Sequence, residues 1–374
     1  MDLTEARKLF PFADSCIYMN HAGLGPLPEP SRVAVVEMAA RLSNPPTAIT
    51  VWPAIIDRLH SSLATLVNAS PENIAITRGT AHGLSLLAVG LDWRAGDNVV
   101  GVDREFPTNV YPWMALADRG VESRWVKPGG GRVDAEMIFR LVDDRTRVVA
   151  LSHVEYWNGF RADLAAIGAE CRRRGVIFSV DAIQSVGAVQ VDVASMNIDH
   201  LSAGAYKWLL GPVGMGFAYI HPDLIERLRP PLVGWGTMVP TSSPSQYRVE
   251  FQHSAKRFEE SIISLLDIAA FQASVDLILD LGPAAIEDRV LALSQRLSGG
   301  LASRGLEVVE PWPRSRTEAS GIVSFRRSGT VAADLLAVLT AGGVEGRVHD
   351  DFVRLAPHFY NTEIEIDRVL ELVS

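Results

Sequence analysis

The middle of the chain, between about residues 70 and 230, alternates short apolar runs rich in β-branched residues with longer stretches of helical periodicity. Runs of this kind predict strands, which we place at residues 73–77, 98–102, 148–152, 176–181, 200–203 and 216–220. A helix is predicted over residues 163–174, a stretch that stops at Gly175. The alternation predicts an α/β fold with a mostly parallel central sheet covered on both faces, and ligands bind such sheets beyond the carboxyl ends of the strands.

The pattern changes after residue 256. Helical runs over residues 262–281 and 283–304 are followed by short strands near 321–325 and 353–356, and by a helix after Asn361. This order predicts a smaller α+β domain, and a chain of 374 residues is long enough for two domains. We therefore predict an N-terminal segment, residues 1–20, that packs with the small domain, a large domain over residues 21–255 and a small domain over residues 256–374.

The composition excludes several classes of protein. Hydrophobic residues make up 48% and charged residues 21% of the chain, which is ordinary for a globular protein. A net charge of −9 argues against nucleic-acid binding as the main role, because phosphate binding needs a basic face. The sequence has no secretory signal and no apolar stretch of about 20 residues, so we predict no membrane span and a cytoplasmic location. Cys16 and Cys171 lack the spacing of a metal site, and no metal is predicted.

One lysine stands in a segment that otherwise has the pattern of a buried one. Residues 202–212, SAGAYKWLLGP, place Lys207 among small and apolar residues. Lysine is ordinarily found on the surface, because its ammonium group is strongly hydrated. Burial disfavours the charged form and lowers the pKa, so Lys207 is a candidate for imine formation. The GPVGMG run after it does not make a dinucleotide-binding fingerprint.

Polar residues also follow three other predicted strands. They are Thr80 in TRGTAHG, Asp181 and Gln184 in SVDAIQ, and His153 in SHVEYWNG. Taken singly, Thr80 and Asp181 are equally typical of helix caps and His153 of a core histidine. With Lys207 they supply what pyridoxal 5′-phosphate (PLP) requires: a lysine for the imine, a carboxylate facing the pyridine nitrogen, a phosphate site at a helix start and a contact to the ring hydroxyl.

These motifs resemble the class V aminotransferase family of fold-type I PLP-dependent enzymes, which includes cysteine desulfurases and isopenicillin N epimerase-like proteins. The similarity runs nearly from end to end. It is carried by IYMNHAGLGPLP, TRGTAHG, EFPTNVYPW, SHVEYWNG, SVDAIQSVGAVQVDV, AYKWLLGPVGMGFAYI, RFEES and VRLAPHFYNTEIEIDRVL. The resemblance implies PLP as cofactor, an amino acid as substrate and a homodimer with active sites at the subunit interface.

The resemblance also implies roles for the matching positions. Lys207 matches the imine lysine, Asp181 the partner of the pyridine nitrogen and Gln184 the contact to the ring hydroxyl. Arg354 matches the arginine that binds the substrate α-carboxylate, a task suited to a planar guanidinium. Two further groups are predicted, the phosphate loop and the N-terminal lining of the substrate pocket: Thr80 and Ala81, and Asn20, His21 and Ala22.

Several positions depart from the family pattern. Phe106 stands where relatives often have a histidine over the cofactor ring, so we predict that its ring stacks there. Tyr206 precedes the lysine and Tyr156 stands where desulfurases commonly have asparagine; with His153, we predict that they contribute to the cofactor and substrate sites. Ile262 lacks the hydroxyl that reaches the neighbouring subunit's phosphate in relatives, and Ser261 is the candidate substitute.

The sequence predicts one cofactor but leaves several reaction types open. Desulfurases carry a mobile cysteine shortly before the arginine that Arg354 matches, and residues 342–354 contain none. We therefore expect no persulfide-forming cysteine desulfurase. The leading interpretation is an aminotransferase in which Lys207 moves the Cα proton of an amino acid.

Other interpretations stay open. A C–S (β-elimination) lyase or an amino-acid epimerase begins with the same proton transfer. A catalytically inactive interaction protein of this fold is disfavoured, because the cofactor residues and Arg354 are intact. Arg347, His349 and residues 235–238 are candidates for the lining of the substrate pocket, with surface roles as the alternative.

Overall fold

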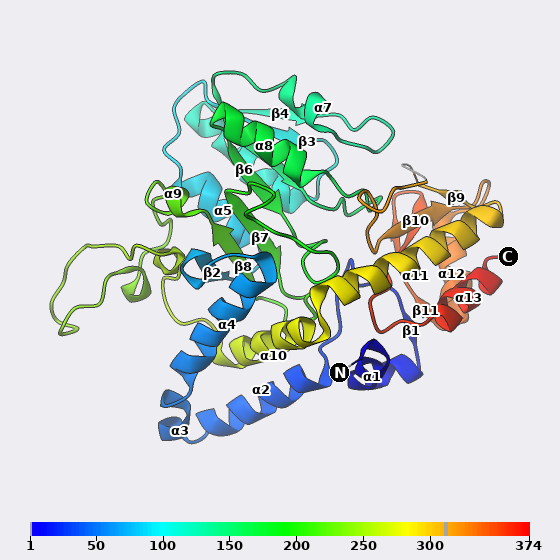
Figure 1. Cartoon of the computed structure of the whole chain (residues 1–374), viewed down its shortest axis with the longest axis horizontal. Coiled ribbons are helices and arrows are strands. Elements are labelled where there is room, and N and C mark those ends of the chain that lie inside the picture. The colour runs from blue at the N-terminus through cyan, green and yellow to red at the C-terminus, as the bar shows by residue number, and fades with distance from the viewer. Residues whose placement is uncertain (1, 310–312) are drawn as a thin grey trace.

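A seven-stranded sheet forms the centre of the larger part of the molecule (Figure 1). In the computed structural model, which describes residues 2–309 and 313–374, its strand order is β2-β8-β7-β6-β5-β3-β4. The strands are β2 (Ile74–Thr77), β3 (Asn98–Val102), β4 (Glu122–Val126), β5 (Thr146–Ser152), β6 (Ile177–Asp181), β7 (His200–Gly204) and β8 (Gly216–Ile220). Strand β8 runs antiparallel to the other six strands, which all run in the same direction. The other six strands therefore end at one edge of the sheet, as the predicted α/β fold requires.

Helices cover both faces of this sheet because successive strand residues point to opposite sides. Val99 and Ile177 pack in one apolar cluster, and their neighbours Val100 and Phe178 pack in another. The first cluster includes residues of α5 (Thr80–Gly90), α6 (Tyr111–Met114) and α9 (Pro222–Ile225). The second includes residues of α4 (Trp52–Val67), α7 (Ala135–Phe139), α8 (Leu164–Arg174) and α10 (Leu265–Leu281).

A smaller antiparallel sheet, of order β12-β13-β10-β9, forms the C-terminal part. Its strands are β9 (Glu307–Val308), β10 (Val323–Arg326), β12 (Arg347–His349) and β13 (Phe352–Leu355), and α12 (Ala332–Ala341) and α13 (Glu363–Leu372) pack with it. The long helix α11 (Pro283–Ser303) joins the two parts (Figure 1). Its Val290 packs in the large apolar core, whereas its Leu297 packs in the small one.

The N-terminal segment lies against the C-terminal part. After α1 (Leu3–Ala6), the short strand β1 (Ile17–Tyr18) pairs in parallel with β11 (Val344–Glu345). The Phe10 ring stacks on Tyr360 with centroids 4.1 Å apart. The next helices, α2 (Glu29–Leu42) and α3 (Pro45–Ile49), lead back to the large part, where α10 packs against α2 and α4. The domain boundaries at residues 20 and 255 stay predictions.

The predicted strands agree with β2, β3, β5, β6, β7 and β8 to within a residue or two at each end. The helix predicted from residue 262 begins at Leu265, because the Ser264 side chain caps it by accepting a hydrogen bond from the Asp267 N–H. Strand β4 was not predicted: it lies at the sheet edge, and its exposed Glu122 and half-buried Arg124 break the apolar run. Among the described residues no helix is long and apolar enough to cross a membrane.

Candidate active site

The carboxyl ends of the parallel strands bring the predicted cofactor residues together. Asp181 is the last residue of β6, and Lys207 follows the end of β7. Thr80 begins the helix that follows β2, and Phe106 lies beyond β3. Ser202 of β7 links two of these positions, because it lies opposite Asp181 in the sheet and its hydroxyl donates to the Thr80 carbonyl at 3.1 Å.

Lys207 lines a cavity of about 330 Å³, a volume within the range of small-molecule sites. The cavity gathers most of the residues predicted to bind cofactor or substrate. Its described lining is Asn20, Ala22, Gly23, Phe106, Tyr156, Gln184, Tyr206, Lys207, Arg347, His349 and Arg354. Arg347 and His349, for which a surface role stood as the alternative, line the same cavity as Lys207.

Lys207 is buried, with 7% of its surface exposed. Burial lowers the pKa of Lys207, the Asp181 charge opposes the shift and the Arg354 charge adds to it, with a net value of about 8. The Nζ atom lies 5.6 Å from the centroid of the Phe106 ring and 5.9 Å from that of Tyr206. The connection between β1 and α2 lies close against the lysine loop, since a Cβ on Gly25 would lie 2.1 Å from the Lys207 carbonyl oxygen. The low pKa predicted from the sequence is thus a consequence of the packing.

Asp181 is buried opposite this lysine, with 2% of its surface exposed. Burial raises the pKa of Asp181 to about 6, while the Ile183 N–H, which donates to it at 3.0 Å, and the Lys207 charge hold the value down. A carboxylate stabilised in this way can remain ionised at neutral pH and balance a positive charge in front of it.

Thr80 supplies an unsatisfied hydroxyl at the start of α5. Its side chain is 5% exposed, and its Oγ1 has no hydrogen-bond partner among the described residues. The N–H groups of the first helical turn have no partner within the helix, so a helix start binds anions well. A buried hydroxyl beside them fits the phosphate of PLP. Ala81, the next residue, is exposed.

Gln184 is held in place from both ends of its amide. Its Nε2 donates to the Ala22 carbonyl at 3.0 Å, and its Oε1 accepts from the Trp208 indole N–H at 2.9 Å. An amide nitrogen carries two hydrogens, so one N–H is left for another acceptor. The predicted contact to a cofactor hydroxyl is compatible with this arrangement.

Arg354 lies in β13 with 3% of its surface exposed. Its Nη1 donates to the Tyr156 carbonyl at 2.7 Å, and burial lowers the pKa of its guanidinium to about 10. Its Nε and the Asn20 Oδ1 are both buried, and neither has a hydrogen-bond partner within the described part of the chain. A buried donor left unpaired in this way indicates a place for an acceptor such as a carboxylate.

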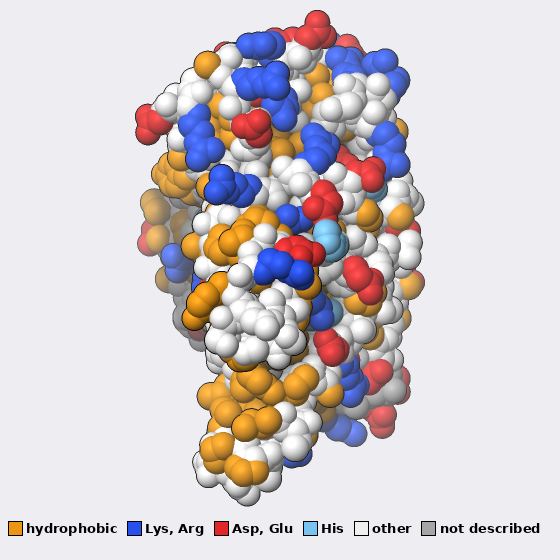
Figure 2. Space-filling model, turned by 90° about the vertical axis from the view of Figure 1, so that its left-hand side faces the viewer, with side chains coloured by type: hydrophobic (Ala, Val, Ile, Leu, Met, Phe, Trp, Pro, Cys, Tyr) orange, Lys and Arg blue, Asp and Glu red, His pale blue; other side chains and the backbone are white. Residues whose placement is uncertain are grey.

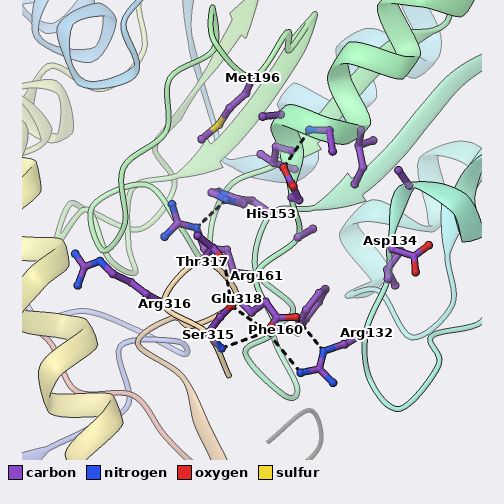
Figure 3. Close-up of a pocket in the computed structure, with 18 of the residues that line it drawn as sticks. Arg132, Asp134, His153, Phe160, Arg161, Met196, Ser315, Arg316, Thr317 and Glu318 are labelled. Carbon is purple, nitrogen blue, oxygen red and sulfur yellow. Dashed lines mark hydrogen bonds and ion pairs between the residues drawn. The ribbon is translucent and has the colours of Figure 1, made fainter. Parts of the chain in front are cut away.

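Asp181, Thr80 and Ala81 are not among the described lining residues of the Lys207 cavity, and three further predicted residues lie elsewhere. His21 is used by the core, where Nδ1 bonds to the Ala356 carbonyl and Nε2 to the Tyr360 hydroxyl, each at 2.7 Å. The His153 Nε2 accepts from Arg161 at 3.2 Å, in a separate cavity of about 900 Å³ (Figure 3). Ser261 is exposed and lines a third hollow with Trp235. In this single chain none of the three reaches the Lys207 cavity.

Two buried acids near Asp181 were not predicted. Glu105 accepts hydrogen bonds from the Ser152 N–H and hydroxyl, and burial raises its pKa to about 8, with the Asp181 charge adding to the shift. Burial also raises the pKa of Glu155 well above its usual value. Burial therefore favours the neutral form of both acids, whereas the Ile183 N–H and the Lys207 charge stabilise the carboxylate of Asp181. Each acid comes three residues after the end of a strand, and Asp181 is the last residue of one, so a position at a strand end was the signal in the sequence.

Comparisons with known proteins find a family model and relatives that span most of this chain. The family model described as aminotransferase class-V matches residues 48–369. A probable cysteine desulfurase from Methanothermobacter thermautotrophicus is 28% identical over 100% of this chain and 98% of its own. The isopenicillin N epimerase of Streptomyces clavuligerus is 28% identical with the same coverage.

Solved structures have the same fold. The cystine C–S lyase C-DES in complex with its reaction product, cysteine persulfide, has a TM-score of 0.90 at 26% identity, covering 98% of this chain and 99% of that one. A C-DES mutant with glycine covalently linked to its PLP cofactor has a TM-score of 0.91, also at 26% identity and with the same coverage.

The expectation that excluded desulfurase chemistry requires a correction. Probable cysteine desulfurases are among the relatives that match most of this chain, so the missing cysteine does not exclude desulfurase chemistry. What the structure shows is where the two thiols lie. Cys171 is buried in α8, Cys16 precedes β1, and neither lines the Lys207 cavity.

Proposed function

Because this chain belongs to the aminotransferase class-V family, we propose that it is a PLP-dependent enzyme that cleaves the carbon–sulfur bond of an amino acid. PLP, when bound, supplies an electron sink for a bond that breaks at the substrate Cα. The observation that carries the proposal is that the buried Lys207 and the buried, incompletely paired Arg354 line one cavity. The desulfurase and C–S lyase relatives favour this reaction over transamination.

Four residues of this chain would hold the cofactor. Lys207 would form the covalent link, and Asp181 would pair with the pyridine nitrogen and favour its protonated form. Thr80 Oγ1 and the first N–H groups of α5 would bind the phosphate, and the remaining N–H of Gln184 would donate to the ring hydroxyl. The fit rests on the orphaned hydroxyl of Thr80 and on the amide of Gln184, which two other bonds already orient.

Arg354 positions the substrate and Lys207 moves its proton. The planar guanidinium grips the α-carboxylate, and the Tyr156 carbonyl orients it by accepting from Nη1. Lys207 Nζ, once released from the cofactor, takes the Cα proton as a general base, for which a pKa near 8 is well matched to neutral pH. In β-elimination the carbon–sulfur bond then breaks with its electron pair on sulfur, and water releases pyruvate and ammonia.

Sulfur leaves this site on a small molecule. Neither cysteine lines the cavity. The sulfur therefore leaves in a released product, as a thiolate or a persulfide, or passes to an external acceptor. The test is incubation of the holoenzyme with L-cysteine and L-cystine, with assays for sulfide, persulfide, pyruvate and ammonia. We expect sulfur release from wild type and none from Lys207→Ala. Sulfur release that survives in Lys207→Ala would contradict the proposal.

Transamination and epimerisation form the second candidate. The epimerase relative spans the whole chain, and the cavity contains no thiol among its described lining residues. Both reactions use the same proton transfer by Lys207, so product analysis separates them. Turnover that requires a keto acid identifies an aminotransferase, and inversion at Cα without loss of the side chain identifies an epimerase.

A second copy of the chain is the proposed partner. Large apolar side chains stand exposed in the segment before α10, including Trp235 at 70%, Tyr247 at 95% and Val249 at 83%. Figure 2 shows further apolar side chains at the lower end of the same face, where α3 lies with the exposed Ile49. Exposed apolar side chains that gather in this way mark interaction surfaces.

A further inference from the structure

The cavity around Lys207 contains one basic group more than the proposed function uses. Among the described lining residues, Lys207, Arg347 and Arg354 are basic, and none is Asp or Glu. Lys207 is committed to the cofactor and Arg354 to the α-carboxylate. The guanidinium of Arg347 has no assigned partner.

Arg347 lies on the same face of the small sheet as Arg354. The two residues are direct partners in the antiparallel pair β12–β13, and side chains directly opposite each other share a face. Arg347 makes no hydrogen bond or ion pair with the described part of the chain. Of the acids within four residues of Arg347, Asp350 pairs with Arg104 at 2.9 Å and Asp351 with Arg326, and Glu345 makes no ion pair with Arg347. The charge of Arg347 is therefore available to a ligand.

His349 adds a second polar group to this face. It lies two residues after Arg347 in β12, and alternate residues of a strand point to the same side of the sheet, so both side chains point the same way. Its Nε2 is buried without a hydrogen-bond partner in residues 2–309 and 313–374, and its ring lies edge-on to Tyr156 with centroids 5.7 Å apart. A neutral imidazole can donate from one ring nitrogen. Arg347 and His349 thus form a pair of donors in the cavity lining.

We infer that Arg347 and His349 bind an acidic group on the substrate side chain. The preferred substrates are then amino acids whose side chain ends in a carboxylate or another oxyacid. Arg354 holds the α-carboxylate, and Arg347 on the neighbouring strand holds the distal acid. This inference rests on the proposed function, because it takes an amino acid bound through Arg354 as given.

The test compares amino acids that have the same shape and differ in charge. The holoenzyme is titrated with L-aspartate against L-asparagine and with L-glutamate against L-glutamine, and the absorption change of the bound cofactor is followed. We expect the acid to reach half-saturation at a concentration at least about tenfold lower than its amide does, because a hydrogen bond to a charged group contributes more to binding than one to a neutral group. Arg347→Gln removes this difference by weakening the acid alone, and His349→Phe reduces it.

Arg326→Gln is the matched control. It removes the same charge from the same sheet, but Arg326 pairs with Glu307 and Asp351 and does not line the cavity. The preference for acids persists in this variant.

Three other outcomes would overturn the inference in distinguishable ways. Equal half-saturation by acid and amide removes the distal subsite and leaves the proposed function intact. An equal loss for acid and amide in Arg347→Gln means that this arginine helps Arg354 hold the α-carboxylate. A holoenzyme that responds to no amino acid contradicts the proposed function itself.

Discussion

At the scale of single residues, the site consists of buried polar groups for which the chain itself does not supply full solvation or hydrogen bonding. The Lys207 amine is buried, the Thr80 hydroxyl and the Arg354 Nε lack partners among the described residues, and each costs folding free energy as it stands. Groups of this kind are retained where a ligand completes them. The residue-scale account therefore predicts that ligand binding and stability respond differently to the same substitution.

The amine of Lys207 should react with the cofactor at an unusually low pH. Burial lowers the pKa of Lys207 to about 8, and only the neutral amine attacks an aldehyde. The rate of PLP incorporation into apoprotein should therefore rise with pH through a midpoint near 8, against an ordinary value of about 10.4 for lysine. Absorbance-detected reconstitution from pH 6 to pH 10, beside Nα-acetyl-lysine as a reference, measures this. A midpoint equal to that of the reference would contradict the burial argument.

Thr80→Val should separate cofactor affinity from stability. The hydroxyl has no partner in the described structure, so its loss should leave the unfolding free energy of the apoprotein unchanged or slightly higher. The PLP dissociation constant should rise about five- to tenfold, as expected for one lost hydrogen bond.

Thr146→Val is the matched control for this experiment. The Thr146 hydroxyl is also buried, but it donates to Asn98 at 2.7 Å and accepts from the Asp143 N–H at 2.9 Å. Its loss should destabilise the protein by about 1–3 kcal/mol and leave the PLP dissociation constant unchanged. Equal effects of the two variants on PLP binding would contradict the role of Thr80.

The sequence predicted the cofactor-binding groups better than it predicted whether each histidine lies in the core or in the site. Lys207 and Asp181 were found because a charge beside an apolar run is rare and their spacing is specific. His21 and His153 could not be assigned, because a buried histidine serves equally as a core group, and which one it becomes depends on distant partners such as Tyr360 and Arg161.

At the scale of elements, the strand ends explain why the site could be predicted at all. Six strands of the large sheet are parallel and end at one edge, so residues that follow them are neighbours whatever their distance in sequence. The rim of the cavity was harder to predict. It depends on the pairing of β12 with β13, which sets Arg347 opposite Arg354, and on the N-terminal segment, whose packing leaves little local signal in the sequence.

Phe10 should be a main anchor of the N-terminal segment. It is 1% exposed and stacks on Tyr360 next to His21. Phe10→Ala should lower the unfolding free energy by about 3–5 kcal/mol, as for other buried aromatic residues. Urea unfolding monitored by circular dichroism measures this. Ile364→Ala, at a position 80% exposed, should change the same quantity by less than about 0.5 kcal/mol. A similar small change in Phe10→Ala would show that the segment is not anchored there.

At the scale of the whole molecule, the proposed homodimer should depend on the exposed apolar segment before α10. Light scattering on the eluting protein should give twice the mass of one chain, which is 40.7 kDa. Trp235→Glu places a charge on a side chain that is 70% exposed in the single chain, and we expect it to yield monomers because burying an unpaired charge at an interface is unfavourable. Ile364→Glu is the control that stays dimeric. A wild-type protein that elutes as a monomer would contradict the proposal.

The central claim is that PLP is linked covalently to Lys207, and chemical trapping tests it most directly. The chain contains four lysines, Lys8, Lys127, Lys207 and Lys256, and only Lys207 is buried. Borohydride reduction of the holoenzyme converts an imine into a stable amine, and peptide mass spectrometry then locates it. The account predicts the cofactor mass on the Lys207 peptide alone. A label on any other lysine, or cofactor that binds without any lysine being labelled, would contradict it.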